Sequence, residues 1–318
     1  TQGVPLKIEE DNRVFPVSDS SQSIIDCLMA VQRDPRVDIH FQTAVKSLHQ
    51  DGEGWRIATN KGDYEGDCVL FASGGSKASW AILEELGLPL IPPVPSLFTF
   101  DVKPFPWKHL AGVSLPDVEV RIEGLKNVTR GPFLVTHWGF SGPAILRMSA
   151  EEARPLHELN YSFRMTINLL PNTSATESLE TLNVCRKTFA RQKAANKALD
   201  GIPSRLWKTL LDEADIGDKR RADLPHKHTE RLHKRIHSAQ FSVNGKSTNK
   251  EEFVTAGGVE LTSINFKTME AKAFPGLFLA GEVLDIDAVT GGFNFQAAWT
   301  GAWVAAQEVA LRCLRFKV

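Results

Sequence analysis

Short apolar runs that lead through glycines into a helical repeat occur near both ends of the chain. Residues 68–72 and 276–280 are nearly unbroken apolar runs, which predict buried strands. Ser73-Gly74-Gly75 follows the first run and Gly281 the second, and such strand-to-helix turns are typical of parallel α/β sheets. The surrounding pattern predicts a helix at 23–31, a strand at 37–41, a hairpin over 54–62, and helices at 77–86 and about 296–314.

The middle of the chain follows a different pattern. Residues 97–170 contain short runs of β-type alternation, broken by one helix that starts at Gly142-Pro143. Residues 173–237 look helical throughout, and Thr173 or Ser174 is expected to cap the first helix.

A chain that leaves one domain and returns to complete it explains why α/β patterns flank a β-rich and a helical segment. The proline-dense stretch Ile91–Pro95 predicts the first boundary. We therefore predict an α/β domain formed by 1–95 and 256–318, an inserted β-rich domain formed by 96–172 and 239–255, and a helical subdomain at 173–238.

Composition narrows the class of protein. The 318 residues have the charged and apolar fractions of a globular protein, and a net charge of −1 gives no global field that would recruit nucleic acid or an anionic membrane. Four scattered cysteines, without a C-x-x-C pair, argue against a zinc ribbon and fit a reducing cytoplasm. We expect a cytoplasmic protein with a small-molecule substrate, no metal and no membrane span, and we do not expect nucleic acid as its partner.

The stretch AGEVLDIDAVTGGFNFQAAW, residues 280–299, combines acids with glycines. Carboxylates repel phosphate but accept hydrogen bonds from hydroxyl groups, so Glu282 and Asp287 suit a sugar or polyol. The glycines and a helix N-terminus suit an anionic or electron-rich group. FAD has both parts, whereas a calcium loop would need further oxygen ligands. The glycines at 74–75 either bring a ligand close to the backbone or form a plain turn.

Several stretches carry a resemblance to a known family: NRVFPVSDSSQSIIDCL, FASGGSKAS, VPSLFTFDV, THWGFSGPAIL, EEFVTAGGVELTSINFKTME and GLFLAGEVLDIDAVTGGFNFQAAWTGAWVAA. They look like the NAD(P)/FAD-dependent oxidoreductases that include aminoacetone oxidases and BaiN-type flavoproteins. The resemblance implies an α/β fold with a glutathione-reductase-like FAD domain, interrupted by a β-barrel-like domain and a small helical domain. It also implies an oxidoreductase that moves hydride between flavin and a small substrate or NAD(P)H.

The resemblance further implies which residues contact FAD. Val45 would lie at the adenine, after the strand at 37–41, and Ala72, Ser73 and Gly74 would line the adenosine side. Gly281 and Glu282 would face the pyrophosphate and ribityl chain, with Asp287 as a further acceptor. The residues expected beside the flavin ring are Thr290, Gly291, Gly292, Phe293 and Asn294.

The sequence departs from the family pattern at its start. The family begins with a βαβ unit whose G-x-G-x-x-G turn holds the FAD pyrophosphate, and this sequence contains no such motif. We therefore expect a chain that lacks roughly one βαβ unit, about 30 residues or more, as a fragment or with that segment as a separate chain. FAD would then lack its main phosphate cradle and would be held weakly by this chain alone.

The loop Thr136–Pro143 is the candidate for substrate chemistry. Ser141 resembles a nucleophile elbow, but Pro143 stands where that motif needs glycine, so we predict Ser141 to be a helix N-cap. The resemblance turns this loop towards the flavin, which makes His137 the candidate catalytic residue. A half-buried structural histidine is the alternative.

A basic stretch, 219–237, supplies an alternative function. Its seven Lys and Arg residues predict either a solvated helix face or a noncatalytic, RNA-binding scaffold. His233 and His237 stand at i and i+4, without an evident third metal ligand. Trp299 and Trp303 have the same spacing on the last helix, which predicts core packing.

Overall fold

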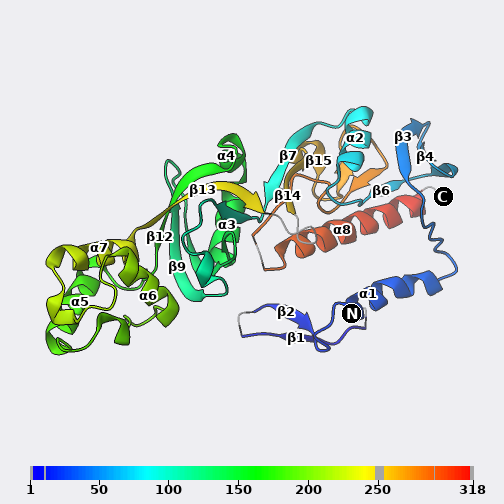
Figure 1. Ribbon diagram of the computed structural model, residues 1–318. Coiled ribbons are helices and arrows are strands. Elements are labelled where there is room, and N and C mark those ends of the chain that lie inside the picture. Colours follow the sequence, from blue (N-terminus) through cyan, green and yellow to red (C-terminus); the bar gives the residue numbers. More distant parts are fainter. Residues whose placement is uncertain (1–2, 11, 248–253, 290, 316–318) are drawn as a thin grey trace. The chain divides into compact units, whose positions relative to one another are not determined.

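The computed structural model describes residues 3–10, 12–247, 254–289 and 291–315. It divides into two compact units (Figure 1). The α/β unit comprises the described residues of 1–91, 258–286 and 291–318, and the barrel unit those of 92–257 and 287–290. The first division, between residues 91 and 92, falls inside the proline-dense stretch. That stretch is part of strand β7 (Leu90–Ser96), which pairs with β14 (Val254–Val259).

The two apolar runs form adjacent strands of one sheet in the α/β unit. β6 (Val69–Phe71) and β17 (Leu277–Leu279) pair in parallel, with Val69 opposite Leu277 and Phe71 opposite Leu279. Two short antiparallel strands, β15 (Ile264–Asn265) and β16 (Glu270–Ala271), extend the sheet beyond β17. All three residues of β17 are buried, as expected for an unbroken apolar run.

Two helices complete this unit as the sequence predicts. α2 spans Lys77–Leu86; the Ser76 hydroxyl accepts a hydrogen bond from the Ser79 N–H at its start, and Gly87, at φ 102°, ends it. α8 spans Phe293–Arg315, begins three residues earlier than predicted, and lies along β17 (Figure 1).

The predicted hairpin is part of a three-stranded antiparallel sheet. Its strands are β3 (Val45–Asp51), β4 (Gly54–Thr59) and β5 (Gly62–Gly66). The buried Trp55 connects it to the parallel sheet, because its indole Nε1 donates to the Pro275 carbonyl at 3.2 Å.

The strand predicted at 37–41 is wrong. The segment that precedes β3 contains β1 (Leu6–Ile8) paired with β2 (Val14–Pro16), α1 (Gln22–Met29) and a 3₁₀ turn (Ala30–Arg33). Residues 37–40 have no regular structure, and Val37, Ile39 and Phe41 are exposed. Alternation alone does not make a strand, because a strand needs a hydrogen-bonded neighbour. Among the described strands, none pairs with this segment.

The barrel unit is built around a closed six-stranded barrel, in the order β10-β11-β8-β13-β12-β9. Aromatic side chains fill it; the rings of Trp107, Phe140 and Phe241, for example, lie 4.7 to 6.0 Å apart between centroids. The barrel strands are β8 (Thr99–Val102), β9 (Ser114–Ile122), β10 (Val128–Val135), β11 (Gly139–Ser141), β12 (Ser162–Asn168) and β13 (Ala239–Ser247). α3 (Pro143–Glu151) and α4 (Ala153–Glu158) lie between β11 and β12.

The segment predicted to be helical forms three α-helices inserted between β12 and β13: α5 (Ala175–Thr188), α6 (Ser204–Glu213) and α7 (His226–His237). Ser174, and not Thr173, caps α5, in a reciprocal arrangement with the side chain and N–H of Glu177. Buried residues of these helices and of the barrel form one continuous apolar core.

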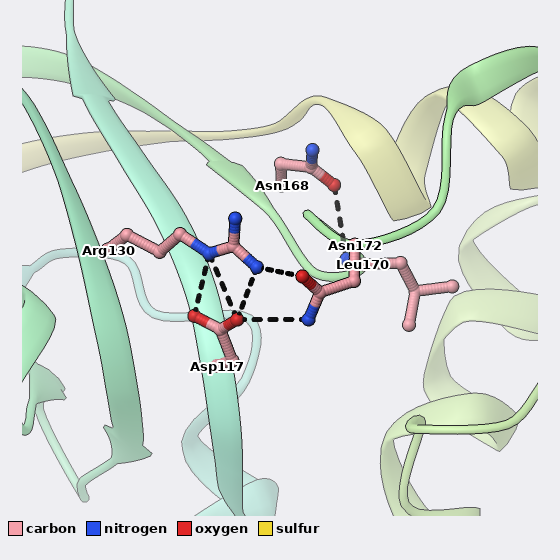
Figure 2. A network of polar contacts seen from close by, with 5 residues as sticks. All are labelled: Asp117, Arg130, Asn168, Leu170 and Asn172. Atoms are coloured by element: carbon pink, nitrogen blue, oxygen red, sulfur yellow. Dashed lines mark hydrogen bonds and ion pairs between the residues drawn. The ribbon is translucent and has the colours of Figure 1, made fainter.

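Polar side chains join the barrel to the turn that enters α5 (Figure 2). The Arg130 guanidinium of β10 donates to both carboxylate oxygens of Asp117 on β9, at 2.6 to 3.1 Å. The Asn172 side chain donates to the same carboxylate at 3.1 Å and accepts from Arg130. The hydrogen bond from Arg130 lowers the pKa of Asp117 below its usual value, so the carboxylate that holds this turn stays ionised.

Two further predictions from the sequence are wrong. Ser141 ends β11 and does not cap α3; Gly142 is the N-cap, at φ 94°, where a Cβ would lie 2.9 Å from the Pro132 carbonyl oxygen. Trp299 and Trp303 are 53% and 65% exposed and do not pack in the core. The side of α8 that packs on the sheet uses small residues instead, with Gly301 against Ala280.

Candidate functional site

The loops that follow β6 and β17 touch one another. The Ala280 N–H donates to the Phe71 carbonyl at 3.2 Å, which aligns the ends of the two strands. A Cβ at Gly75 would lie 3.3 Å from the Glu282 carbonyl oxygen, so the second glycine after β6 permits this approach. The buried Trp80 of α2 donates from Nε1 to the Val283 carbonyl at 3.1 Å. The carboxyl ends of two parallel strands therefore share one edge, where open α/β sheets bind ligands.

A third segment, the end of β14, supports the loop from the other side. The Val259 N–H donates to the Val283 carbonyl at 2.9 Å, and the Asp285 N–H donates to the Val259 carbonyl at 3.0 Å. Gly258, at φ 134°, permits this contact, because a Cβ there would lie only 2.5 Å from the Val283 carbonyl oxygen. The position of the 281–284 loop is thus fixed by backbone contacts that tolerate no side chain.

The start of α8 lies close to the same loop. A Cβ at Gly281, which has φ 80°, would contact the Cβ of Ala298 at 3.6 Å. The first turn of α8 begins five residues before Ala298, directly after Gly291 and Gly292. A helix start leaves N–H groups without intrahelical partners and carries a partial positive charge, both of which favour an anionic ligand.

Glu282 is the distinctive polar group of this edge. It is half-buried, and none of the described residues hydrogen-bonds or pairs with its carboxylate. Burial raises the pKa of Glu282 above its usual value. A carboxylate that loses hydration without gaining a protein partner costs free energy, and a ligand hydroxyl would supply the missing hydrogen bond.

The family model described as the HI0933-like protein Rossmann domain matches residues 1–308. The chain belongs to this family. The resemblance to the oxidoreductases that include BaiN-type flavoproteins is therefore confirmed, and so is a mixed α/β fold with a Rossmann-type domain and a barrel.

The chain is similar to relatives that are named as two kinds of enzyme. Ribosomal RNA dihydrouridine synthases are 31% identical to it: that of Escherichia coli over 303 residues, covering 92% of this chain and 72% of the relative, and that of Haemophilus influenzae over 285 residues, covering 88% and 65%. A 3-dehydro-bile acid delta(4,6)-reductase of Clostridium scindens is 25% identical over 311 residues, covering 94% and 76%. The chain thus spans about two thirds to three quarters of these relatives.

The structure brings together most of the residues that the resemblance assigns to the cofactor. Ala72, Ser73 and Gly74 follow β6 on the exposed edge, and Gly281 and Glu282 follow β17. Gly291, Gly292, Phe293 and Asn294 form the entry and first residues of α8. Val45 lies in a different sheet, where it opens β3 opposite Thr59. Thr290 lies outside the described residues.

Two predicted site residues belong to the barrel unit. Asp287 accepts a hydrogen bond from the Ser96 hydroxyl at 2.9 Å, so one of its carboxylate oxygens already has a protein partner. His137 lies in the tight turn between β10 and β11, beside Trp138, and its side chain is exposed. The half-buried alternative for His137 is therefore wrong.

Sequence reasoning missed the residues that hold the edge together. Gly75, Gly258 and the Trp80 indole position the 281–284 loop without offering chemistry of their own. The Gly257-Gly258 pair was a usable signal, because consecutive glycines in a strand pattern mark a close backbone approach.

Other features of the molecule lie away from this edge. A cavity of about 400 Å³ on the barrel is lined by Arg121, Lys126 and Arg164, among others. His233 and His237 bond to α5, through the Ala175 carbonyl and the Ser178 hydroxyl. Among the helices of the described ranges, none is long and apolar enough to cross a membrane.

Proposed function

We propose that this chain is a flavin-dependent enzyme that reduces a ring carbon–carbon double bond adjacent to a carbonyl group. Dihydrouridine is uridine with its ring double bond reduced, and a delta(4,6)-reductase acts on ring double bonds of an oxo-steroid, so both names of relatives support this reaction class. Identity of 31% with the synthases, against 25% with the reductase, favours a pyrimidine base of RNA over a steroid.

One observation carries the proposal. In an HI0933-like Rossmann domain, the half-buried Glu282 stands where the 72–75 and 281–284 loops meet, and no described residue satisfies its carboxylate. A titratable group perturbed by burial at the ligand-binding edge of an α/β sheet is a strong candidate for a functional residue.

The residues of this edge fit FAD. Glu282 suits a ribityl or ribose hydroxyl, and Asp287 would add a second acceptor. Gly74, at φ 70°, and Gly75 leave the main chain uncovered for the adenosine side, with Ala72, Ser73 and Val45 as further candidates. The start of α8 would face the pyrophosphate or the electron-rich edge of the ring. When bound, flavin supplies hydride transfer, and the finer arrangement that we propose is glutathione-reductase-like.

His137 is the residue that we propose for the proton. Reduction of a double bond adds hydride to one carbon and a proton to the other, and NAD(P)H is the proposed source of the hydride. An exposed imidazole, which a substrate can reach and whose ring N–H can act as a general acid, suits the delivery of the second hydrogen. A cytoplasmic location, which we also propose, would provide both NAD(P)H and RNA.

Release of flavin tests the proposal. The purified protein is incubated with excess FAD, freed of unbound ligand, and denatured, and the supernatant is read near ~450 nm, because flavin is the group expected to supply the redox chemistry. We expect saturable FAD binding by fluorescence, with at least part of the flavin kept through the removal of unbound ligand because the chain lacks the phosphate-holding turn, and we expect NADPH to bleach the bound absorbance. A colourless supernatant, with no saturable FAD binding by fluorescence, would overturn the proposed function.

A further inference from the structure

Charge is distributed unevenly along this chain. Residues 173–238, which include α5, α6 and α7, contain 14 Lys and Arg residues and nine Asp and Glu residues, a net charge of +5, although the whole chain carries −1. The remaining residues therefore carry −6. Figure 1 shows these three helices gathered at one end of the barrel unit. A positive segment on an otherwise acidic protein directs a polyanion to one place.

α7 presents its positive charge on one side. Lys227, Arg231 and Lys234 stand at i, i+4 and i+7, and all three are exposed. The opposite side, with Leu232 and Ile236, is buried in the shared core. Arg231 pairs with Asp215, whereas Lys227 and Lys234 form no ion pair with any described residue. The side chains of this face span about 10 Å along the helix, and two of the three are uncompensated.

Cations of a second segment lie beside the start of α7. The contacts of Ala175 with His233 and of Ser178 with His237 place the first turn of α5 beside the last turns of α7, whereas the C-terminal end of α5 lies near residues 221–222, shortly before α7 begins. Backbone bonds from Arg221 and Ala222 to residues 190–192 hold that end in place. The basic residues there are Arg186, Lys187 and Arg191, and no acidic partner for them occurs among the described residues.

We propose that this basic surface, formed by Lys227, Arg231 and Lys234 of α7 and by Arg186, Lys187 and Arg191 at the end of α5, binds the phosphate backbone of an RNA substrate. The inference rests on the proposed function, which it deepens by assigning the surface that holds the RNA. Phosphate contacts of Lys and Arg position a nucleic acid without reading its sequence, which leaves recognition of the base to the site of reduction.

The chemistry of the surface favours RNA over an anionic membrane. A helix that lies on a membrane inserts large apolar residues beside its basic ones. Between residues 175 and 238, all of which the structure describes, Val184 is the only exposed large apolar residue. The apolar side of α7 is used for packing, so its exposed side offers polar and charged groups, in which Lys227, Arg231 and Lys234 outnumber the single carboxylate of Glu230, itself paired with His226.

The salt dependence of RNA binding tests this surface. Lys227→Gln/Lys234→Gln removes two charges, and glutamine has nearly the helix propensity of lysine, so α7 is expected to stay folded. Lys46→Gln/Lys267→Gln removes two exposed charges from the α/β unit and is the matched control. The probe is a fluorescent fragment of protein-free ribosomal RNA, titrated at four or more salt concentrations. Circular dichroism checks the helix content of both variants.

We expect the slope of log Kd against log salt to fall by about 2 in the α7 variant, because each phosphate contact contributes about 1, and to be unchanged in the control. Equal slopes for the two variants, or stronger binding to phosphatidylserine vesicles than to RNA, would overturn the inference. FAD retention is measured on the same preparations. If the protein binds RNA through α7 but holds no FAD, the proposed function is contradicted, whereas the assignment of this surface to RNA is supported.

Discussion

At the scale of single residues, the candidate site depends most on a carboxylate that the protein itself leaves unsatisfied. Glu282 is half-buried, and its carboxylate forms no hydrogen bond or ion pair with the described residues. By contrast, Asp117 accepts hydrogen bonds from Arg130 and Asn172, and Asp287 accepts one from the Ser96 hydroxyl. A protein that pairs its structural carboxylates in this way is expected to keep an unpaired one for a ligand.

Glu282→Gln should therefore raise the stability of the cofactor-free protein and weaken its binding of FAD. Burial raises the pKa of Glu282, so the folded protein is more stable when this side chain is protonated. That stability is fully present below the unfolded pKa of about 4.3 and is lost as the pH rises through the folded pKa, where the buried carboxylate becomes charged. At neutral pH we expect the cofactor-free variant to be the more stable, by less than about 1 kcal/mol because the side chain is partly solvated. Urea unfolding at about pH 4 and pH 7.5 measures this difference, which should vanish at the lower pH.

The same variant should bind FAD more weakly. A hydrogen bond to a charged acceptor contributes about 1.5–3 kcal/mol, so we expect roughly a tenfold to hundredfold rise in Kd. Glu53→Gln, at an exposed turn of the same unit, is the control and should change neither quantity. FAD affinity equal to that of the wild type in Glu282→Gln would remove Glu282 from the site.

At the scale of elements, the sequence predicts those structures whose burial is local. The apolar runs of β6 and β17, and α2 between Ser76 and Gly87, follow from pattern and caps alone. The failures are long-range. Whether residues 37–41 find a strand partner, or which side of α8 faces the sheet, depends on neighbours distant in sequence. Gly142 replaces Ser141 as a cap because the Pro132 backbone leaves no room for a side chain.

The candidate site was predictable to a similar degree. Acids and glycines at 281–294 predict a ligand with hydroxyl and anionic parts, and the structure shows Glu282 half-buried directly after β17. The sequence alone could not show that Gly258 and Trp80 hold the loop. Both contact the backbone carbonyl of Val283, and contacts with a distant backbone group produce no periodic pattern in the sequence.

Gly258→Ala should therefore damage the site through the backbone. Its Cβ would lie 2.5 Å from the Val283 carbonyl oxygen, at a φ of 134° that alanine rarely adopts. We expect a loss of about 2–4 kcal/mol of stability, combining strain with displacement of the loop, and weaker FAD retention. Gly62→Ala is matched in backbone, at φ 119°, but meets no atom within 4 Å. It should cost about 1–2 kcal/mol and leave FAD retention intact. Thermal unfolding and flavin release measure both effects.

At the scale of the whole molecule, a net charge of −1 conceals two segments of opposite character. This is why composition argued against nucleic acid as a partner, whereas the placement of Lys227 and Lys234 on one face of α7 argues for it. Glu282, Gly74 and the start of α8, on which the proposed flavin site chiefly rests, belong to the α/β unit, whereas the proposed RNA surface belongs to the barrel unit. An enzyme that modifies a base within RNA needs both functions, and a division between units allows each to be altered separately.

Hydrogen exchange followed by mass spectrometry should separate the two surfaces. FAD is expected to slow exchange in peptides that contain residues 72–75, 281–284 and the start of α8, and to leave α5 and α7 unchanged. RNA is expected to slow exchange in α5 and α7, because bound phosphates would reduce the local unfolding through which the amide groups of these exposed helices exchange. Raising salt from about 50 to 200 mM should remove the RNA effect, because counterion release weakens each phosphate contact, and should largely preserve that of FAD. Protection of α7 by RNA that persists at the higher salt would mean that contacts other than phosphate hold the complex.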